Sequence, residues 1–141
     1  MADVGSPAGA LGLMQIMPAT GRRIASMLGE RFPHAFVLLC PENNIRFGTY
    51  YLGIRWKELQ NNPVLASAAY NAGVNRVRRW LPEEGSVPAD IWIETIPFFE
   101  TRNYIEMIFS YNSVYRQILG LEQAGISAIM PDVFSKEKSG P

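Results

Sequence analysis

The sequence has few of the side chains that bind metals or form disulfides. It contains one cysteine, Cys40, and one histidine, His34, in 141 residues. A lone cysteine cannot form an internal disulfide, and so little histidine disfavours both a zinc site and a histidine-based catalytic triad. We therefore predict no metal and no cofactor, and we expect Cys40 to be a small buried apolar residue.

The sequence also lacks an excess of charge and long apolar runs. Thirteen basic and thirteen acidic residues cancel, and no block of Lys or Arg is present to contact a phosphate backbone. The apolar runs are too short to span a bilayer, and residues 1–10 do not have the basic start and apolar core of a signal peptide. We expect no nucleic-acid partner, no membrane span, and any export signal to lie outside this chain.

What the sequence does contain is a series of helix signals. Its 48% hydrophobic content suits one globular domain with a sizeable core. Proline at likely first turns and glycine at stops delimit amphipathic stretches, and no alternating strand pattern appears. The predicted fold class is all-α, with helices near 18–29, 41–60, 63–73, 74–81 and 90–96 and a long one ending at Gly120. The core stripe predicted for the long helix is Ile105, Ile108, Phe109, Asn112, Tyr115, and Ile118 or Leu119.

Three segments place polar groups beside helix ends or breaks, namely "GLMQIMP", "AAYNAG" and "IPFFETRNY". Gln15 stands among large apolar residues, so we expect a buried amide that either ties down a loop or faces a ligand cavity. Asn71 precedes Gly73 and either caps a helix or faces a groove. Glu100 begins the long helix, where a carboxylate complements the helix dipole whether or not it binds a ligand.

Four stretches occur in an order that identifies a family: "GALGLMQIMPATG", "NIRFGTYYL", "LASAAYNAGVNRVRRWLP" and "WIETIPFFETRNYIEMI". From about Ser6 to about Gly120 the sequence resembles the catalytic domain of soluble lytic murein transglycosylases. The resemblance implies a lysozyme-like helical domain, related to goose-type lysozyme, in the periplasm or cell envelope of a bacterium. We expect residues 1–120 to form this domain and residues 121–141 to be a C-terminal extension, partly frayed.

The resemblance also implies a reaction on the glycan strands of peptidoglycan. In this family a glutamic acid protonates the oxygen that leaves when the bond between N-acetylmuramic acid and N-acetylglucosamine breaks. The muramoyl C6 hydroxyl then attacks C1 and forms a 1,6-anhydro product. The acid must lie in a partly apolar cleft, which raises its pKa, and no second carboxylate is required to activate water.

That glutamic acid is the element of the family pattern that this sequence does not show. The family's Glu-Ser pair precedes the motif that begins here at Ser6, and its position falls a few residues before Met1. Asp3 lies in the connecting loop and is not followed by serine, so it is no substitute. We expect a domain without its first helix and acid, and a 141-residue chain with negligible turnover.

Eight substrate-binding residues carry over from the family's motifs, and no catalytic residue does. They are Ser6, Met14, Gln15 and Met17 from the first motif, Tyr70 and Asn71 from "AYNAG", and Glu100 and Tyr104 from "ETRNY". Tyrosine suits this role because its ring contacts sugar C–H groups while its hydroxyl forms a hydrogen bond.

Two alternatives remain open. The first is a non-catalytic module that binds peptidoglycan or acts as a scaffold, and the second is an ordinary muramidase that leaves a reducing end. Because the missing helix would otherwise cover apolar surface, we also expect self-association through that surface.

Overall fold

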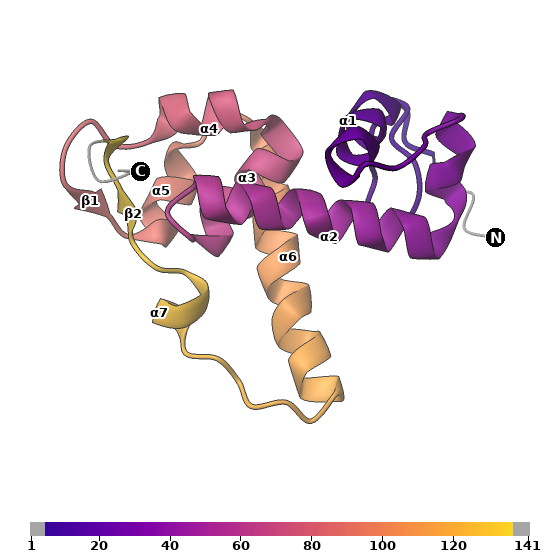
Figure 1. Ribbon diagram of the computed structural model, residues 1–141. Helices are drawn as coiled ribbons and strands as arrows, with labels where there is room; N and C mark the ends of the chain where they lie inside the picture. The colour runs from indigo at the N-terminus through magenta and orange to yellow at the C-terminus, as the bar shows by residue number, and fades with distance from the viewer. Residues whose placement is uncertain (1–4, 137–141) are drawn as a thin grey trace. The chain divides into compact units, whose positions relative to one another are not determined.

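The computed structural model describes residues 5–136 and divides the chain into two compact units, Met1–Gly53 and Ile54–Pro141, where one domain was expected. The fold is mostly α-helical, as predicted, and Figure 1 labels its elements. The long helix α2 (Pro41–Glu58) contributes residues to both units. None of the helices in the described residues is long and apolar enough to cross a membrane.

The first unit contains α1 (Pro18–Leu28), a 3-10 helix η1 (Ala35–Leu39) and the first part of α2. Helix α1 begins at a proline, which needs no backbone N–H there, and ends at Gly29 in the left-handed conformation, as predicted. A small cluster of buried side chains forms its core: Ile16, Ile24, Ala25, Leu38 and Phe47. Cys40, predicted to be buried, is exposed, because it follows η1 at the surface.

The loop that precedes α1 is held in place by Asn44 of α2. This side chain is fully buried; its Nδ2 donates to the carbonyls of Leu11 and Leu38, each at 2.8 Å, and its Oδ1 accepts from Met14 N at 2.7 Å. Gly12 passes so close that a Cβ there would lie 2.2 Å from Asn44 Nδ2. One amide therefore fixes the shape of the loop that carries the first motif.

The second unit is built around α3 (Pro63–Ala72), which is buried on nearly all sides. Helix α3 packs against α4 (Val74–Trp80) and α6 (Phe99–Ile118), and α5 (Ala89–Thr95) also packs against α6. Alanine and serine between Ala66 and Ala69 leave room for this close packing. The largest core side chain is Trp92, whose Nε1 donates to Trp80 O at 2.8 Å.

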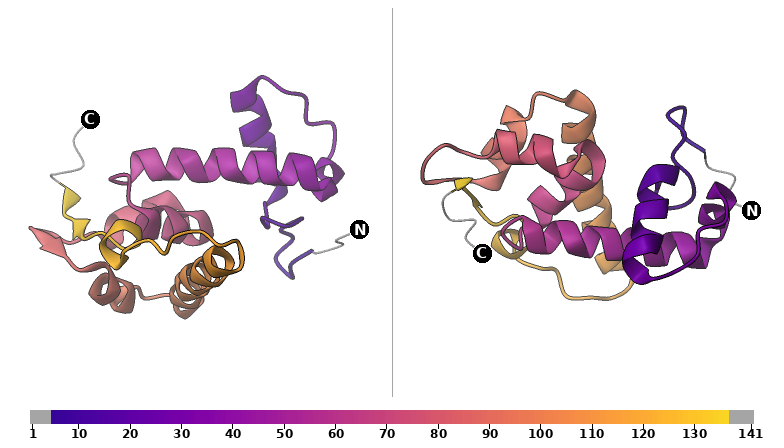
Figure 2. Two further views of the ribbon diagram at one scale, coloured as in Figure 1. Left: turned by 90° about the horizontal axis from the view of Figure 1, so that it is seen from below. Right: turned by 45° about the horizontal axis from the view of Figure 1, so that its top comes forward.

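Residues after Gly120, expected to lose order, return to this unit through α7 (Ile126–Ile129) and β2 (Val133–Phe134), as Figure 2 shows. Strand β2 pairs antiparallel with β1 (Ser86–Val87), and Val133 is buried in the core. Asn62 ties this segment down, because its Nδ2 donates to Pro131 O and Asp132 O, each at 3.2 Å. The predicted fraying at 137–141 falls outside the described residues.

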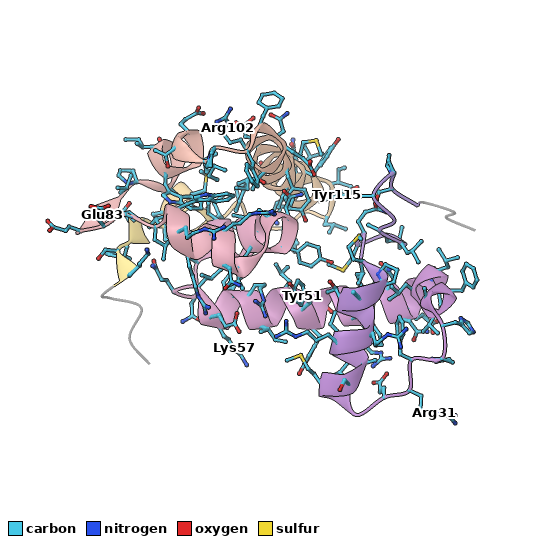
Figure 3. The ribbon with its side chains drawn as sticks, turned by 90° about the horizontal axis from the view of Figure 1, so that it is seen from above. Arg31, Tyr51, Lys57, Glu83, Arg102 and Tyr115 are labelled. Carbon is cyan, nitrogen blue, oxygen red and sulfur yellow. The ribbon has the colours of Figure 1, made fainter. Side chains whose placement is uncertain are left out.

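The core stripe predicted along α6 is correct only in the first half of the helix. Ile105 is buried, and Ile108 and Phe109 are half-buried. The rest of the prediction is wrong. Asn112 is exposed, Tyr115, labelled in Figure 3, is 61% exposed, and Ile118 and Leu119 are 71% and 67% exposed. The periodicity identified an apolar face, but the contacts with α3 and α5 do not cover that face to its end.

Candidate functional site

The site residues of the second unit lie where α3 ends and α6 begins. Thr101, on the first turn of α6, is 1% exposed, and its Oγ1 donates to Asn71 Oδ1 at 2.8 Å. Since the amide oxygen of Asn71 is occupied by Thr101, the amide nitrogen remains as a donor for another group. The side chain therefore does not act as a simple helix cap.

Asn71 and Glu100 line one pocket of about 430 Å³. Glu100 is exposed in the first turn of α6, where its charge complements the helix dipole. Its position is therefore compatible with both roles considered for it, the electrostatic one at the helix end and the binding of a ligand. The same pocket is also lined by two aromatic side chains, Phe98 and Phe99. A donor amide, a carboxylate and apolar rings in one pocket suit a ligand with hydroxyl and amide groups on an apolar ring.

The two tyrosines of the prediction lie beside this pocket in the chain. Tyr70 precedes Asn71 on α3, and Tyr104 follows Glu100 by one helical turn on α6; both are half-buried. Burial raises the pKa of the Tyr104 phenol above its usual value of 10.0. The Tyr104 hydroxyl therefore keeps its proton throughout the neutral range and can donate a hydrogen bond.

The first-motif residues all belong to the other unit. Gln15, predicted to be buried, is exposed; its φ is 49°, and its Nε2 donates to Gly12 O at 2.8 Å. This bond is the loop-tying role that we considered. Ser6 is half-buried, and its Oγ accepts from Ala10 N at 2.9 Å.

The two methionines of the first motif differ in their surroundings. Met14 is half-buried against the first unit's core, and its Sδ would lie 2.4 Å from a Cβ on Gly48. Met17 precedes α1 and is 42% exposed. Met14 therefore shapes the loop, whereas Met17 presents its side chain to the surface.

Six residues that line the pocket were not predicted as site residues from the sequence: Ala72, Arg76, Pro97, Phe98, Phe99 and Thr101. The phenylalanines stand inside the segment "IPFFETRNY" that was singled out, so the segment was the available signal. No sequence signal marked Arg76, because Arg78 and Arg79 follow it and the three together are typical of a solvated helix face. Among residues 5–136 no group of three metal-binding side chains occurs.

The comparisons with known proteins decide the family. The sequence model of the Transglycosylase SLT domain matches residues 2–93. The chain belongs to this family. The model of the soluble lytic transglycosylase helical domain matches residues 95–124 of this SLT chain, a segment that includes all of α6.

Curated relatives carry the same family name. The SLT chain is 44% identical over 126 residues to the soluble lytic murein transglycosylase of Salmonella typhimurium, covering 88% of this chain and 20% of that protein. It is 42% identical over 127 residues to the Escherichia coli K12 protein of that name, covering 89% and 20%. The chain thus spans about a fifth of the length of these relatives.

Solved structures confirm the lysozyme-like lytic transglycosylase fold. The inactive mutant of lytic transglycosylase Slt from Pseudomonas aeruginosa, in which one glutamate is replaced by glutamine, matches with a TM-score of 0.85 and 41% identity. That match covers 96% of this chain and 22% of the other. The 70 kDa soluble lytic transglycosylase of Escherichia coli matches with a TM-score of 0.83 and 37% identity, covering 94% and 22%.

Proposed function

We propose that this SLT chain is the catalytic-domain part of a peptidoglycan lytic transglycosylase of a bacterial periplasm or cell envelope. It would bind glycan strands at the bond between N-acetylmuramic acid and N-acetylglucosamine, which the enzyme cleaves to a 1,6-anhydro end. The observation that carries the proposal is the match of the SLT family over residues 2–93.

The pocket at the ends of α3 and α6 supports a sugar ligand. The Asn71 amide nitrogen is a donor for an acetamido carbonyl, because Thr101 already occupies the amide oxygen. The Glu100 carboxylate can accept from sugar hydroxyl or amide N–H groups. Tyr70 and Tyr104 would add ring contacts and hydroxyl donors, so the second unit supplies four of the eight proposed substrate contacts.

The other four proposed contacts come from the loop of the first unit. Gln15 and Ser6 would supply polar groups, and Met14 and Met17 apolar surface. Gln15 is proposed from its place in the first motif, and its bond to Gly12 O holds its side chain at the surface of this loop.

The proton donor is the group that these residues do not provide. In the Pseudomonas aeruginosa protein the mutant with a single glutamate replaced is inactive. No carboxylate of the present 141 residues stands at the corresponding place in the family's motif, so we propose that this polypeptide alone turns over negligibly.

The test is release of 1,6-anhydro-muropeptides from purified sacculi, followed by mass spectrometry. Three proteins are compared: the 141-residue chain, the same chain extended by the residues that its gene encodes upstream, and that extension with the Glu of its Glu-Ser pair changed to Gln. We expect product from the unmodified extension alone. Robust release by the 141-residue chain would overturn the proposed absence of the acid, and a product heavier by one water would indicate a muramidase.

A non-catalytic peptidoglycan-binding or scaffolding role is the second candidate. The observation that favours it is the pocket at the ends of α3 and α6, whose amide, carboxylate and aromatic side chains suit the binding of a sugar. Co-sedimentation of the extended chain with sacculi, without release of any product, would support this role instead of catalysis.

Self-association is the last part of the proposal. The surface proposed for it is the one that the helix upstream of Ser6 would cover. The second half of α6 exposes further apolar side chains, with Tyr111, Val114, Tyr115 and Ile118 each at least 49% exposed. Apolar patches of this kind mark contacts between proteins. Sedimentation velocity at several protein concentrations should show a rising mean mass, and a constant monomer mass would contradict the expectation.

A further inference from the structure

The pocket that contains Asn71 and Glu100 also contains a cation, Arg76, which the substrate contacts proposed above do not use. Arg76 is the third residue of α4, and its side chain is anchored at two points. Nη1 donates to Ala72 O at 3.2 Å, and Cζ lies 5.1 Å from the centroid of the Phe98 ring. The guanidinium is therefore held over an aromatic face at the pocket wall.

The ring beneath the guanidinium is itself fixed by the core. Phe98 meets Trp80 edge to face, with centroids 5.3 Å apart. The Trp80 carbonyl accepts from Nε1 of Trp92, which is 1% exposed. A continuous set of contacts thus runs from the core to Arg76, so less side-chain freedom is lost when a ligand binds to this arginine than to a mobile one.

The charge of Arg76 is not neutralised by the pocket's own carboxylate. The ion pairs among the described residues join Arg46 to Glu30 and Arg55 to Glu58, and neither involves Arg76 or Glu100. Only one nitrogen of the planar guanidinium is used by Ala72, so its other N–H groups can donate to a ligand. Planar forks of this kind match carboxylates in two-point contact.

A purely structural role for Arg76 would be to cap α3. Ala72 is the last residue of that helix, and a cation stabilises the carbonyls of a helix C-terminus. Lysine would do the same work, and such a cap needs neither the ring contact with Phe98 nor a place in the pocket. The two roles therefore make different predictions for Arg76→Lys and for ligand charge.

We propose that Arg76 binds a carboxylate of the glycan ligand, so that this pocket selects muramic-acid-containing strands over neutral N-acetylglucosamine polymers. The inference rests on the proposed function, since it assumes a saccharide at Asn71 and Glu100. Peptidoglycan offers two kinds of carboxylate. The stem peptide carries its own, and the lactyl ether of muramic acid carries a free one only where the peptide has been removed, because in a peptide-bearing muramic acid this carboxyl is amide-bonded to the stem. Both share the chemistry that a guanidinium recognises, and separate ligands distinguish them.

The experiment measures calorimetric affinity of the 141-residue chain for four soluble ligands of equal sugar length. They are peptide-bearing glycan, glycan stripped of peptides by an amidase so that only lactyl carboxylates remain, the stripped glycan with those carboxylates converted to methylamides, and a neutral N-acetylglucosamine oligomer. Variants are Arg76→Gln, Arg76→Lys and the control Arg79→Gln, which removes one exposed charge from the same helix outside the pocket. Unfolding midpoints are recorded for all four proteins.

We expect wild type and Arg79→Gln to bind a carboxylate-bearing glycan roughly tenfold more tightly than the methylamide, which is the usual size of a charged hydrogen bond. Arg76→Gln should bind both about equally, with its affinity for the methylamide unchanged, and Arg76→Lys should keep only part of the preference. Tighter binding of the peptide-bearing glycan than of the stripped glycan identifies the stem peptide as the source. Tighter binding of the stripped glycan identifies the lactyl group, and either preference should disappear in Arg76→Gln.

Three results would overturn the inference. If wild type binds the charged and the methylamide ligands equally well, the pocket does not recognise a carboxylate, and the proposed function stays intact. An equal loss of affinity for both ligands in Arg76→Gln, with a lower unfolding midpoint, makes Arg76 a cap of α3. Failure of wild type to bind any of the four ligands contradicts the proposed function as well.

Discussion

Each of the two compact units contains one fully used asparagine side chain, but the two serve different needs. Asn44 holds a loop that has little core beneath it, whereas Asn62 closes a unit that already has a large one. The first unit buries five side chains in its cluster, and the second buries thirteen. Where apolar burial is scarce, a polar side chain fixes the backbone, so the first unit should be the more sensitive to loss of one amide.

The largest effect is expected for Asn44→Ala. It removes three hydrogen bonds, the two that Asn44 donates to the carbonyls of Leu11 and Leu38 and the one that it accepts from Met14 N, while Leu11 O keeps its bond from Ile16 N. We expect this loss to cost about 3 to 5 kcal/mol of unfolding free energy. Urea unfolding measures the cost, and hydrogen exchange at Leu11 and Ile16 locates it. The matched control Asn43→Ala removes one weaker bond, at 3.4 Å, and should change little. Equal losses in both variants would remove the special role of Asn44.

Gly12→Ala tests the same loop from the opposite side. The residue has φ +75°, and the new Cβ would lie 2.2 Å from Asn44 Nδ2 and 2.5 Å from Leu38 O. We expect a loss of about 2 to 4 kcal/mol from strain and crowding together. Gly9→Ala is the control, because φ there is +89° with nothing within 4 Å of the added Cβ. It should cost about 1 kcal/mol, and the difference between the variants measures the close approach alone.

Asn62→Ala is the corresponding change in the second unit. It removes the cap on α3, where Oδ1 accepts from Val64 N at 2.9 Å, and the two bonds to the segment before β2. We expect about 2 to 3 kcal/mol. Asn62→Ser should recover the cap but not the distant bonds, so roughly half the loss should return. If serine restores everything, the two bonds from Asn62 to Pro131 O and Asp132 O add nothing to the stability of this unit.

The contrast also explains what the sequence could predict. Helix ends at Pro18, Gly29, Pro63 and Gly73 were correct because their signals are local, since φ restrictions and a missing N–H act within one turn. Neither asparagine was foreseen as a structural anchor. Asn44 bonds to a residue 33 positions away and Asn62 to one 70 positions away, and nothing in the neighbouring sequence encodes such partners.

The site shows the same division between local and distant information. Asn71 and Glu100 were found from motifs, and the structure brings them to one pocket. The prediction that Gln15 is buried was wrong. The residue lies in a turn, where its φ is 49°, and its side chain is exposed although the next residue, Ile16, is buried. Arg76 was missed because its contact with Phe98, its bond to Ala72 O and its place in the pocket distinguish it from the arginines that follow, and all three are features of the folded chain.

The smallest effect, and the one that joins stability to the site, is expected for Thr101→Val. Valine keeps the shape of threonine but removes the donor to Asn71 Oδ1, a partly buried bond of 2.8 Å, so we expect a loss of about 1 kcal/mol. Thr95→Val is the control: it removes a similar bond, to Trp92 O at 2.7 Å, from an exposed position outside the pocket, and should cost less.

The two variants should differ more in affinity for soluble peptidoglycan fragments than in stability. Without the bond from Thr101, the Asn71 amide is ordered only when the ligand binds. The conformational entropy that the side chain then loses lowers the affinity. If Thr101→Val binds as wild type does, Thr101 serves the core of the second unit and not its pocket.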